Sequence, residues 1–237
     1  MNPLSRRSFV SQAAAGLAAL GMAAEAPRVT QAQLVWKGSE WKLAAFHKLV
    51  NDPAGVKQLF EVTQISDGRF LNGIKNSLNG LQFGFDIPKE KIKVAVCLHG
   101  AANMVNYDDF IWNKYQIGEW LSVNDPSTGK PAVRNIFYKA KQPLDAAAFA
   151  KDPSDEESVY QDASAEALQA RGVQFLSCHT ASEEQARALV KRNKLTQTPE
   201  EVVHEMLAHT LPDVLVVASM VAAIALLQCE GHYAYTA

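Results

Sequence analysis

The sequence predicts an α/β fold, a single domain in which a mainly parallel sheet is flanked by helices. Short apolar runs alternate along the chain with segments whose apolar residues recur every three or four positions. Residues 92–98 form a nearly continuous apolar run, which is typical of a strand buried on both faces of a parallel sheet. Apolar residues make up 48% of the chain, enough to fill one large core.

The first 32 residues are predicted to be a signal peptide. Ser5-Arg6-Arg7-Ser8-Phe9 stands directly before a weakly apolar, Ala-rich run over residues 13–24. Paired arginines in this setting are typical of a twin-arginine (Tat) signal. Thr30-Gln31-Ala32 offers a better cleavage site than residues 24–26, which would leave a proline first. We therefore expect a protein that folds in the cytoplasm, engages the Tat translocase and works in the periplasm.

The charge of the mature domain, residues 33–237, argues against some partners. Without residues 1–32 the chain keeps 20 basic and 24 acidic side chains, a formal charge of −4. Such a protein has no electrostatic reason to bind nucleic acid or anionic lipid. The apolar run at 213–228 is shorter than the roughly 20 residues of a spanning helix. We expect no nucleic-acid partner, no stable membrane insertion, and in this run a buried strand followed by a buried helix.

In the first half of the domain, two strands alternate with two helices before a long irregular segment. The periodicity predicts strands at 58–62 and 92–98 and helices at 70–81 and 108–121. Residues 125–153 contain four prolines and no sustained period. We interpret them as a long excursion from the fold.

The second half begins with a helix that runs from about residue 158 to Gly172, since glycine commonly ends helices. Two capping boxes, each a hydroxyl residue followed three positions later by Glu or Gln, then predict helix starts. The remaining predicted elements are a strand at 173–177, helices opening at Ser182 and at Thr198-Pro199, a strand at 214–217 and a helix from 220.

Three cysteines are too few for a disulfide scaffold, and an odd number leaves one unpaired. Cys97 lies inside an apolar strand, where we expect it to be buried and unreactive. Cys229 ends the last helix beside Glu230, and we favour the same inert role there because both features disfavour a thiolate.

Two predicted strands end in groups that can do chemistry. One ends at Cys97-Leu98-His99-Gly100 and the other at Ser177-Cys178-His179. Ligands of open parallel sheets gather at the carboxyl ends of the strands, so Cys178, His99 and His179 are the candidate catalytic residues. A following helix N-terminus and a neighbouring imidazolium would lower the pKa of the Cys178 thiol. A nucleophilic thiolate and a small buried hydrophobe remain open as interpretations of Cys178.

No metal or cofactor is expected. His204 and His209 are five residues apart, which turns them about 140° from each other on a helix, whereas zinc-protease helices space them by four. No other group of cysteines and histidines has the spacing of metal ligands.

Three segments resemble the DsrE/DsrF-like family, and the similarity extends from about Leu59 to Tyr235. They are the strand from Val94 into His99-Gly100, the strand 172–178, and the last helix running into Gly231-His232-Tyr233. The resemblance implies a small α/β domain that assembles into homo- or hetero-oligomers, some of which carry sulfur as a persulfide on a cysteine at a strand end. Cys178 resembles that cysteine. The excursion and the export signal set this chain apart from the cytoplasmic sulfur-relay members.

The sequence thus leads to two hypotheses and leaves open whether the protein is an enzyme. The first is an exported sulfur-handling protein, a homo-oligomer in which Cys178 accepts a persulfide from a donor protein or a small sulfur compound and His99 and His179 shape the pocket. The second is a non-catalytic periplasmic module that binds a partner or ligand and keeps Cys178 buried and inert.

Overall fold

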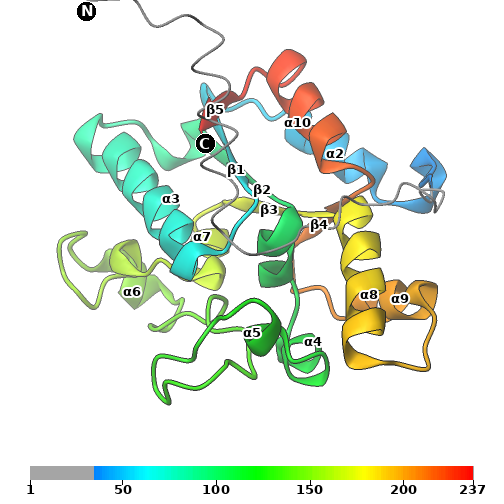
Figure 1. Ribbon diagram of the computed structural model, residues 1–237. Coiled ribbons are helices and arrows are strands. Elements are labelled where there is room, and N and C mark those ends of the chain that lie inside the picture. Colours follow the sequence, from blue (N-terminus) through cyan, green and yellow to red (C-terminus); the bar gives the residue numbers. More distant parts are fainter. Residues whose placement is uncertain (1–34, 237) are drawn as a thin grey trace, which may run out of the picture. The chain divides into compact units, whose positions relative to one another are not determined.

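The computed structural model describes residues 35–236, so the predicted signal peptide lies outside the described residues. Five parallel strands form one sheet in the order β4-β3-β2-β1-β5 (Figure 1). The strands are β1 (Val56–Val62), β2 (Ile92–Leu98), β3 (Gln174–Cys178), β4 (Leu215–Val217) and β5 (Ala234–Thr236). The prediction of an α/β fold with a parallel sheet is confirmed.

Helices cover both faces of this sheet (Figure 1). One face packs against α2 and α10, and the other against a larger group that includes α3, α7, α8 and α9. The helices are α2 (Leu43–Val50), α3 (Arg69–Asn79), α4 (Asp109–Lys114), α5 (Ile117–Trp120), α6 (Ala146–Ala150), α7 (Ala165–Ala170), α8 (His179–Asn193), α9 (Pro199–Ala208) and α10 (Met220–Cys229).

The central strand β2 explains why the sheet has two cores. Val94, Val96 and Leu98 join the core under α3 and α8, whereas Ala95 and Cys97 join the core under α2 and α10. Successive side chains of a strand point to opposite faces, so a strand covered on both sides must be apolar throughout. The interpretation of the continuous apolar run at 92–98 is confirmed.

Three predicted helix boundaries are wrong, each for a local reason. The expected helix at 108–121 is divided into α4 and α5, because Gln116 has a positive φ of 52°. The helix expected from about 158 begins at α7, where the Ser164 side chain accepts the Ala167 N–H as an N-cap. The helix expected from Ser182 starts three residues earlier, because the buried Ser182 Oγ donates to the Cys178 carbonyl and does not cap.

Other elements lie where the sequence places them. Thr198 and Glu201 form the predicted capping box of α9, with Pro199 as the first helical residue. The apolar run at 213–228 is the predicted strand and helix, β4 and α10. No helix within residues 35–236 has both the length and the apolar character needed to cross a membrane. The sequence did not predict α2 or β5.

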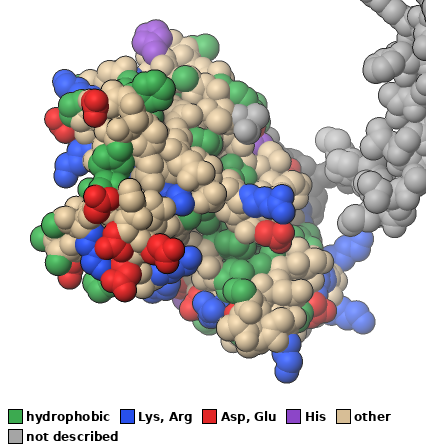
Figure 2. All heavy atoms as spheres, turned by 90° about the vertical axis from the view of Figure 1, so that its left-hand side faces the viewer, with side chains coloured by type: hydrophobic (Ala, Val, Ile, Leu, Met, Phe, Trp, Pro, Cys, Tyr) green, Lys and Arg blue, Asp and Glu red, His purple; other side chains and the backbone are tan. Residues whose placement is uncertain are grey.

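The predicted excursion at 125–153 contains only α6 and an isolated bridge between Asn124 and Pro131. Its buried Asn135 side chain donates to the carbonyls of Val105 and Tyr107, which fixes the segment to the domain. On the face shown in Figure 2, acidic and basic side chains are interspersed and neither sign gathers into a broad patch.

Candidate functional site

Cys178 lies where the connections of two neighbouring strands diverge. The helix that follows β3, α8, packs on one face of the sheet, and the helix that follows β4, α10, packs on the other. In open parallel sheets this divergence at the carboxyl ends of the strands opens a crevice in which ligands bind. Cys178 is the last residue of β3 and the N-cap of α8, so its thiol stands at this switch point.

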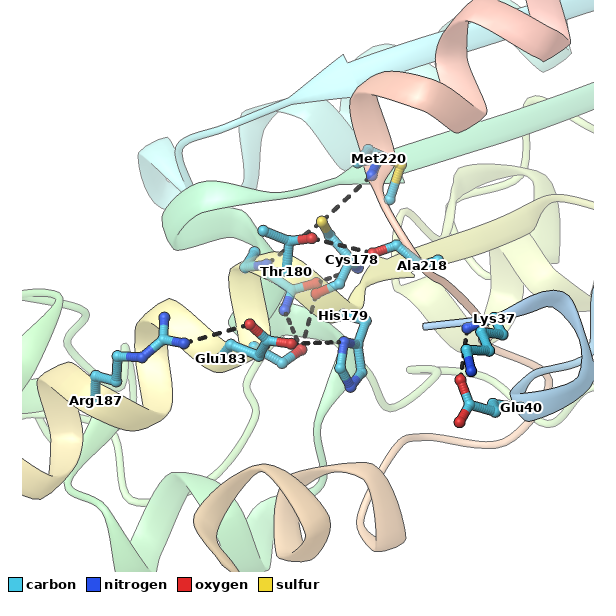
Figure 3. Close-up of polar contacts among 12 residues, drawn as sticks. Lys37, Glu40, Cys178, His179, Thr180, Glu183, Arg187, Ala218 and Met220 are labelled. Carbon is cyan, nitrogen blue, oxygen red and sulfur yellow. Dashed lines mark hydrogen bonds and ion pairs between the residues drawn. The ribbon is translucent and has the colours of Figure 1, made fainter. Parts of the chain in front are cut away.

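The sulfur of Cys178 accepts hydrogen bonds from the first turns of two helices. The N–H groups of Ala181 in α8 and Met220 in α10 each lie 3.4 Å from Sγ, and the Thr180 N–H contributes a third bond (Figure 3). The Thr180 hydroxyl also donates to the Ala218 carbonyl at 3.1 Å, which joins the two helix starts. Amide donors at helix N-termini stabilise negative charge on a sulfur atom.

Burial outweighs these donors. The Cys178 side chain is only 5% exposed, and its desolvation raises the thiol pKa more than the backbone hydrogen bonds lower it. Glu184 adds a further increase in the pKa through its negative charge. The expectation of a lowered pKa is therefore wrong in direction, although the predicted place before a helix N-terminus is correct. At neutral pH the free thiol is uncharged.

His179 is buried beside Cys178 in the sequence but engages other partners. Its ring stacks on the indole of Trp36 with centroids 3.9 Å apart. Its Nδ1 lies 3.2 Å from Glu183 Oε1 (Figure 3). Arg187 Nη2 lies 3.4 Å from the other oxygen of that carboxylate. Burial lowers the pKa of His179, so the imidazolium expected to activate the thiol is disfavoured.

His99 belongs to a separate polar cluster at the same edge of the sheet. Its Nε2 lies 2.8 Å from Glu61 Oε1, and the Tyr235 hydroxyl donates to Glu61 Oε2. The hydrogen bond from Tyr235, and then the interaction with His99, lower the pKa of Glu61 despite its partial burial. Among residues 35–236 no hydrogen bond or ion pair joins either candidate histidine to the Cys178 sulfur.

The turn after β2 requires a glycine. Gly100 has a φ of +54°, and a Cβ there would lie 2.9 Å from the Thr63 carbonyl oxygen. This close approach lets the His99 N–H donate to the Val62 carbonyl and directs the chain into a 3₁₀ helix, Gly100–Asn106. The His99-Gly100 pair therefore fixes the cluster around Glu61 at the end of β1 and β2.

Behind the two strand ends lies a buried polar network centred on Asn103. Its Oδ1 accepts the Cys178 N–H and the Ser177 hydroxyl, both at 2.9 Å. Its Nδ2 donates to Gln185 Oε1 at 3.0 Å and lies within 3.2 Å of the Ser182 hydroxyl oxygen. A fully paired buried network rigidifies its surroundings, so Asn103 holds the β3–α8 junction in one geometry.

The other two cysteines differ from each other. Cys97 is fully buried, as expected, and burial raises its thiol pKa well above the ordinary value. Cys229 is exposed, so the interpretation of this residue as an inert buried side chain is wrong. It is the last residue of α10, where its side chain stays accessible to solvent.

His204 and His209 are not brought together as ligands. His209 caps the C-terminus of α9, its Nδ1 lies 2.9 Å from Asp108 Oδ2, and its ring stacks on Phe110. Within residues 35–236 no group of three His, Cys, Asp or Glu side chains has the arrangement of a metal site.

Four residues of this region were missed by sequence reasoning. Glu61 could have been found, because it is a lone carboxylate near the end of an apolar strand. Tyr235, Trp36 and Asn103 gave no such signal, since their partners lie far away in the sequence.

No family model matches the chain, and no curated protein or solved structure does so either. The resemblance to the DsrE/DsrF-like family therefore stays a prediction made from the residues.

Proposed function

We propose that this chain is an exported, DsrE-like sulfur-handling protein in which Cys178 accepts sulfur as a persulfide. The observation that supports this best is the position of the thiol at the switch point, with N–H groups from the first turns of α8 and α10 bonded to its sulfur. These fixed donors favour a sulfur anion there, which a thiol and a persulfide each form on losing a proton.

The transfer is balanced without a metal or a redox partner. The Cys178 sulfur attacks the outer sulfur of a donor persulfide, R–S–SH. A new S–S bond forms on Cys178, the S–S bond of the donor breaks, and the donor leaves as the thiolate R–S⁻, which takes up the proton lost by the Cys178 thiol and becomes R–SH. Because the thiol is nearly buried and uncharged, transfer requires the first turns of α8 and α10 to separate transiently, which also hydrates the thiol and eases its deprotonation.

The two histidines have supporting roles in this proposal. The stack of His179 on Trp36 borders the start of α8, and the bond of His99 to Glu61 holds the neighbouring strand end. Both shape the surroundings of Cys178, and neither acts as the base for its thiol.

The test is the mass of the intact protein after incubation with polysulfide. A Cys229→Ser background removes the exposed thiol, which would otherwise react first. In that background we expect one bound sulfur, a gain of about 32 Da per added atom. Adding Cys178→Ser should abolish the gain. Adding Cys97→Ser, which changes a fully buried thiol, should leave it unchanged.

A gain that survives Cys178→Ser, or no gain in the Cys229→Ser background with polysulfide or a protein persulfide donor, would reject the sulfur-carrier proposal.

One observation favours a second candidate, a binding module in which Cys178 is structural. The Cys178 sulfur caps α8 and packs in the core under α10. In this case Cys178→Ser would lower the melting temperature, and the wild-type protein would take up no sulfur at this position. The same mass measurement therefore separates the two functions.

We also propose that the protein is a homo-oligomer, as the family resemblance implies, and that it works in the periplasm, as the predicted signal peptide implies. Light scattering of the purified domain tests the assembly, and a single-chain mass would reject it.

A further inference from the structure

Arg171 carries a buried guanidinium nitrogen that lacks an acceptor. Its Nη2 donates to Asn79 Oδ1 at 2.8 Å, but Nη1 is buried and has no hydrogen-bond partner among residues 35–236. No carboxylate in that part of the chain lies within ion-pair distance of this guanidinium. Burial lowers the pKa of Arg171 to about 10. An unpaired buried charge is costly, so this position favours an incoming anion.

A pocket of about 270 Å³ lies next to this side chain. Arg171 and Lys89 bring two positive charges to its lining and Glu90 brings one negative charge, which leaves a formal excess of one positive charge. Such an excess matches a ligand with a single negative charge. A carboxylate also matches the planar guanidinium, which can bind both oxygens at once.

The rest of the pocket wall is aromatic. The rings of Phe149 and Tyr160 line it, and the Arg171 guanidinium lies 5.0 Å from the centre of the Tyr160 ring. Tyr160 is held edge-on between Phe149 and Phe83, with ring centroids 6.1 and 4.9 Å away. Aromatic walls favour the apolar body of an organic ligand over a hydrated inorganic ion.

We infer that this pocket binds a small organic acid, with its carboxylate on Arg171 and its apolar body against Phe149 and Tyr160. The inference does not rest on sulfur transfer. The pocket lies beside Lys89 and Gly172, just before β2 and β3 begin, whereas Cys178 stands at the other end of β3. The proposed pocket also gives a function to the excursion at 125–153, because Phe149 belongs to α6 within that segment.

The test uses sodium benzoate as the probe, with calorimetric titration and thermal unfolding of the mature domain. We expect saturable binding at one site and a melting temperature that rises by about 3 °C at ten times the dissociation constant. Arg171→Met should abolish binding without unfolding the protein, since it removes one hydrogen bond, to Asn79, together with a buried nitrogen that lacks an acceptor among residues 35–236. Lys191→Gln is the matched control, because Lys191 is an exposed cation of α8 and does not line the pocket.

Phe149→Ala gives an independent variant, expected to weaken benzoate binding at least tenfold by removing one wall. Equal benzoate affinity in the wild type, Arg171→Met and Phe149→Ala would overturn the inference. Inorganic phosphate binding more tightly than benzoate to the wild type would overturn the assignment to an organic acid.

Discussion

At Cys178 two opposing effects act on the same sulfur atom. Hydrogen bonds from Ala181 and Met220 favour the thiolate, and desolvation favours the thiol. Desolvation dominates because the side chain is sealed between α8 and α10. The reactivity of Cys178 therefore depends mainly on how often the first turns of α8 and α10 separate to expose the thiol. The charge of the neighbouring residues matters less.

The three thiols should differ in their rates of alkylation. In native protein at pH 7 we expect iodoacetamide to label Cys229 first, with Cys178 slow and Cys97 unlabelled until denaturation. A pKa raised above the ordinary value of 9.0 leaves less than about 1% of Cys178 as thiolate at pH 7, so its rate should still be rising above pH 9. Peptide mass spectrometry of timed samples measures each site.

Fast labelling of Cys178 at pH 6, with its rate already level by pH 8, would contradict this prediction. It would indicate that the helix donors outweigh burial after all. The exposed Cys229 provides the internal control in the same sample, because both sites meet the same reagent concentration.

At the level of elements, the β3–α8 junction depends on a side chain from the segment after β2. Asn103 lies in the 3₁₀ helix Gly100–Asn106 and bonds to Ser177, Cys178 and Gln185 at once. One amide thus couples the end of β2 to the start of α8. Any change in its packing should alter both strand ends together.

Asn103→Ala tests this coupling. The substitution leaves the Cys178 N–H and the Ser177 hydroxyl buried without their acceptor, so we expect a loss of about 2–4 kcal/mol in the free energy of unfolding. Asn76→Ala is the control, since this residue is exposed in α3 and should change stability by less than about 0.5 kcal/mol. Urea denaturation measures both. Equal effects of the two substitutions would contradict a central role for Asn103.

On the scale of the whole molecule, the strand order decides where chemistry can occur. Strands β1 to β4 follow one another across the sheet, and β5 returns to the far side of β1. That return places α10 on the opposite face from α8 and creates the divergence at Cys178. It also brings Tyr235 beside β1, where its hydroxyl reaches Glu61.

The predicted export of the protein by the Tat pathway can be tested by substituting Arg6 and Arg7. Changing Arg6 and Arg7 together to lysine should trap the unprocessed precursor in the cytoplasm, because the Tat pathway recognises the arginine pair. Immunoblots of periplasmic and cytoplasmic fractions measure the outcome. A variant with Arg28→Lys, which lies outside the pair, should be exported normally. Export of the double variant at the wild-type rate would remove the prediction of Tat transport.

The sequence by itself determined the elements whose signals are local. β2 is recognisable because a strand buried on both faces must be apolar at every position, and α9 because its caps lie within four residues. The strand-end rule also singled out Cys178, because it needs only the order of strand and helix. These features depend on neighbours along the chain, which the sequence contains directly.

Only the tertiary structure decided how the candidate residues behave. The pKa of Cys178 is raised by helices that arrive from two different faces, and His99 and His179 take partners, Glu61 and Trp36, that lie far from them in the sequence. The exposure of Cys229 likewise depends on what packs over the end of α10. Desolvation and long-range pairing are set by segments that folding brings together, so no pattern along the chain encodes them.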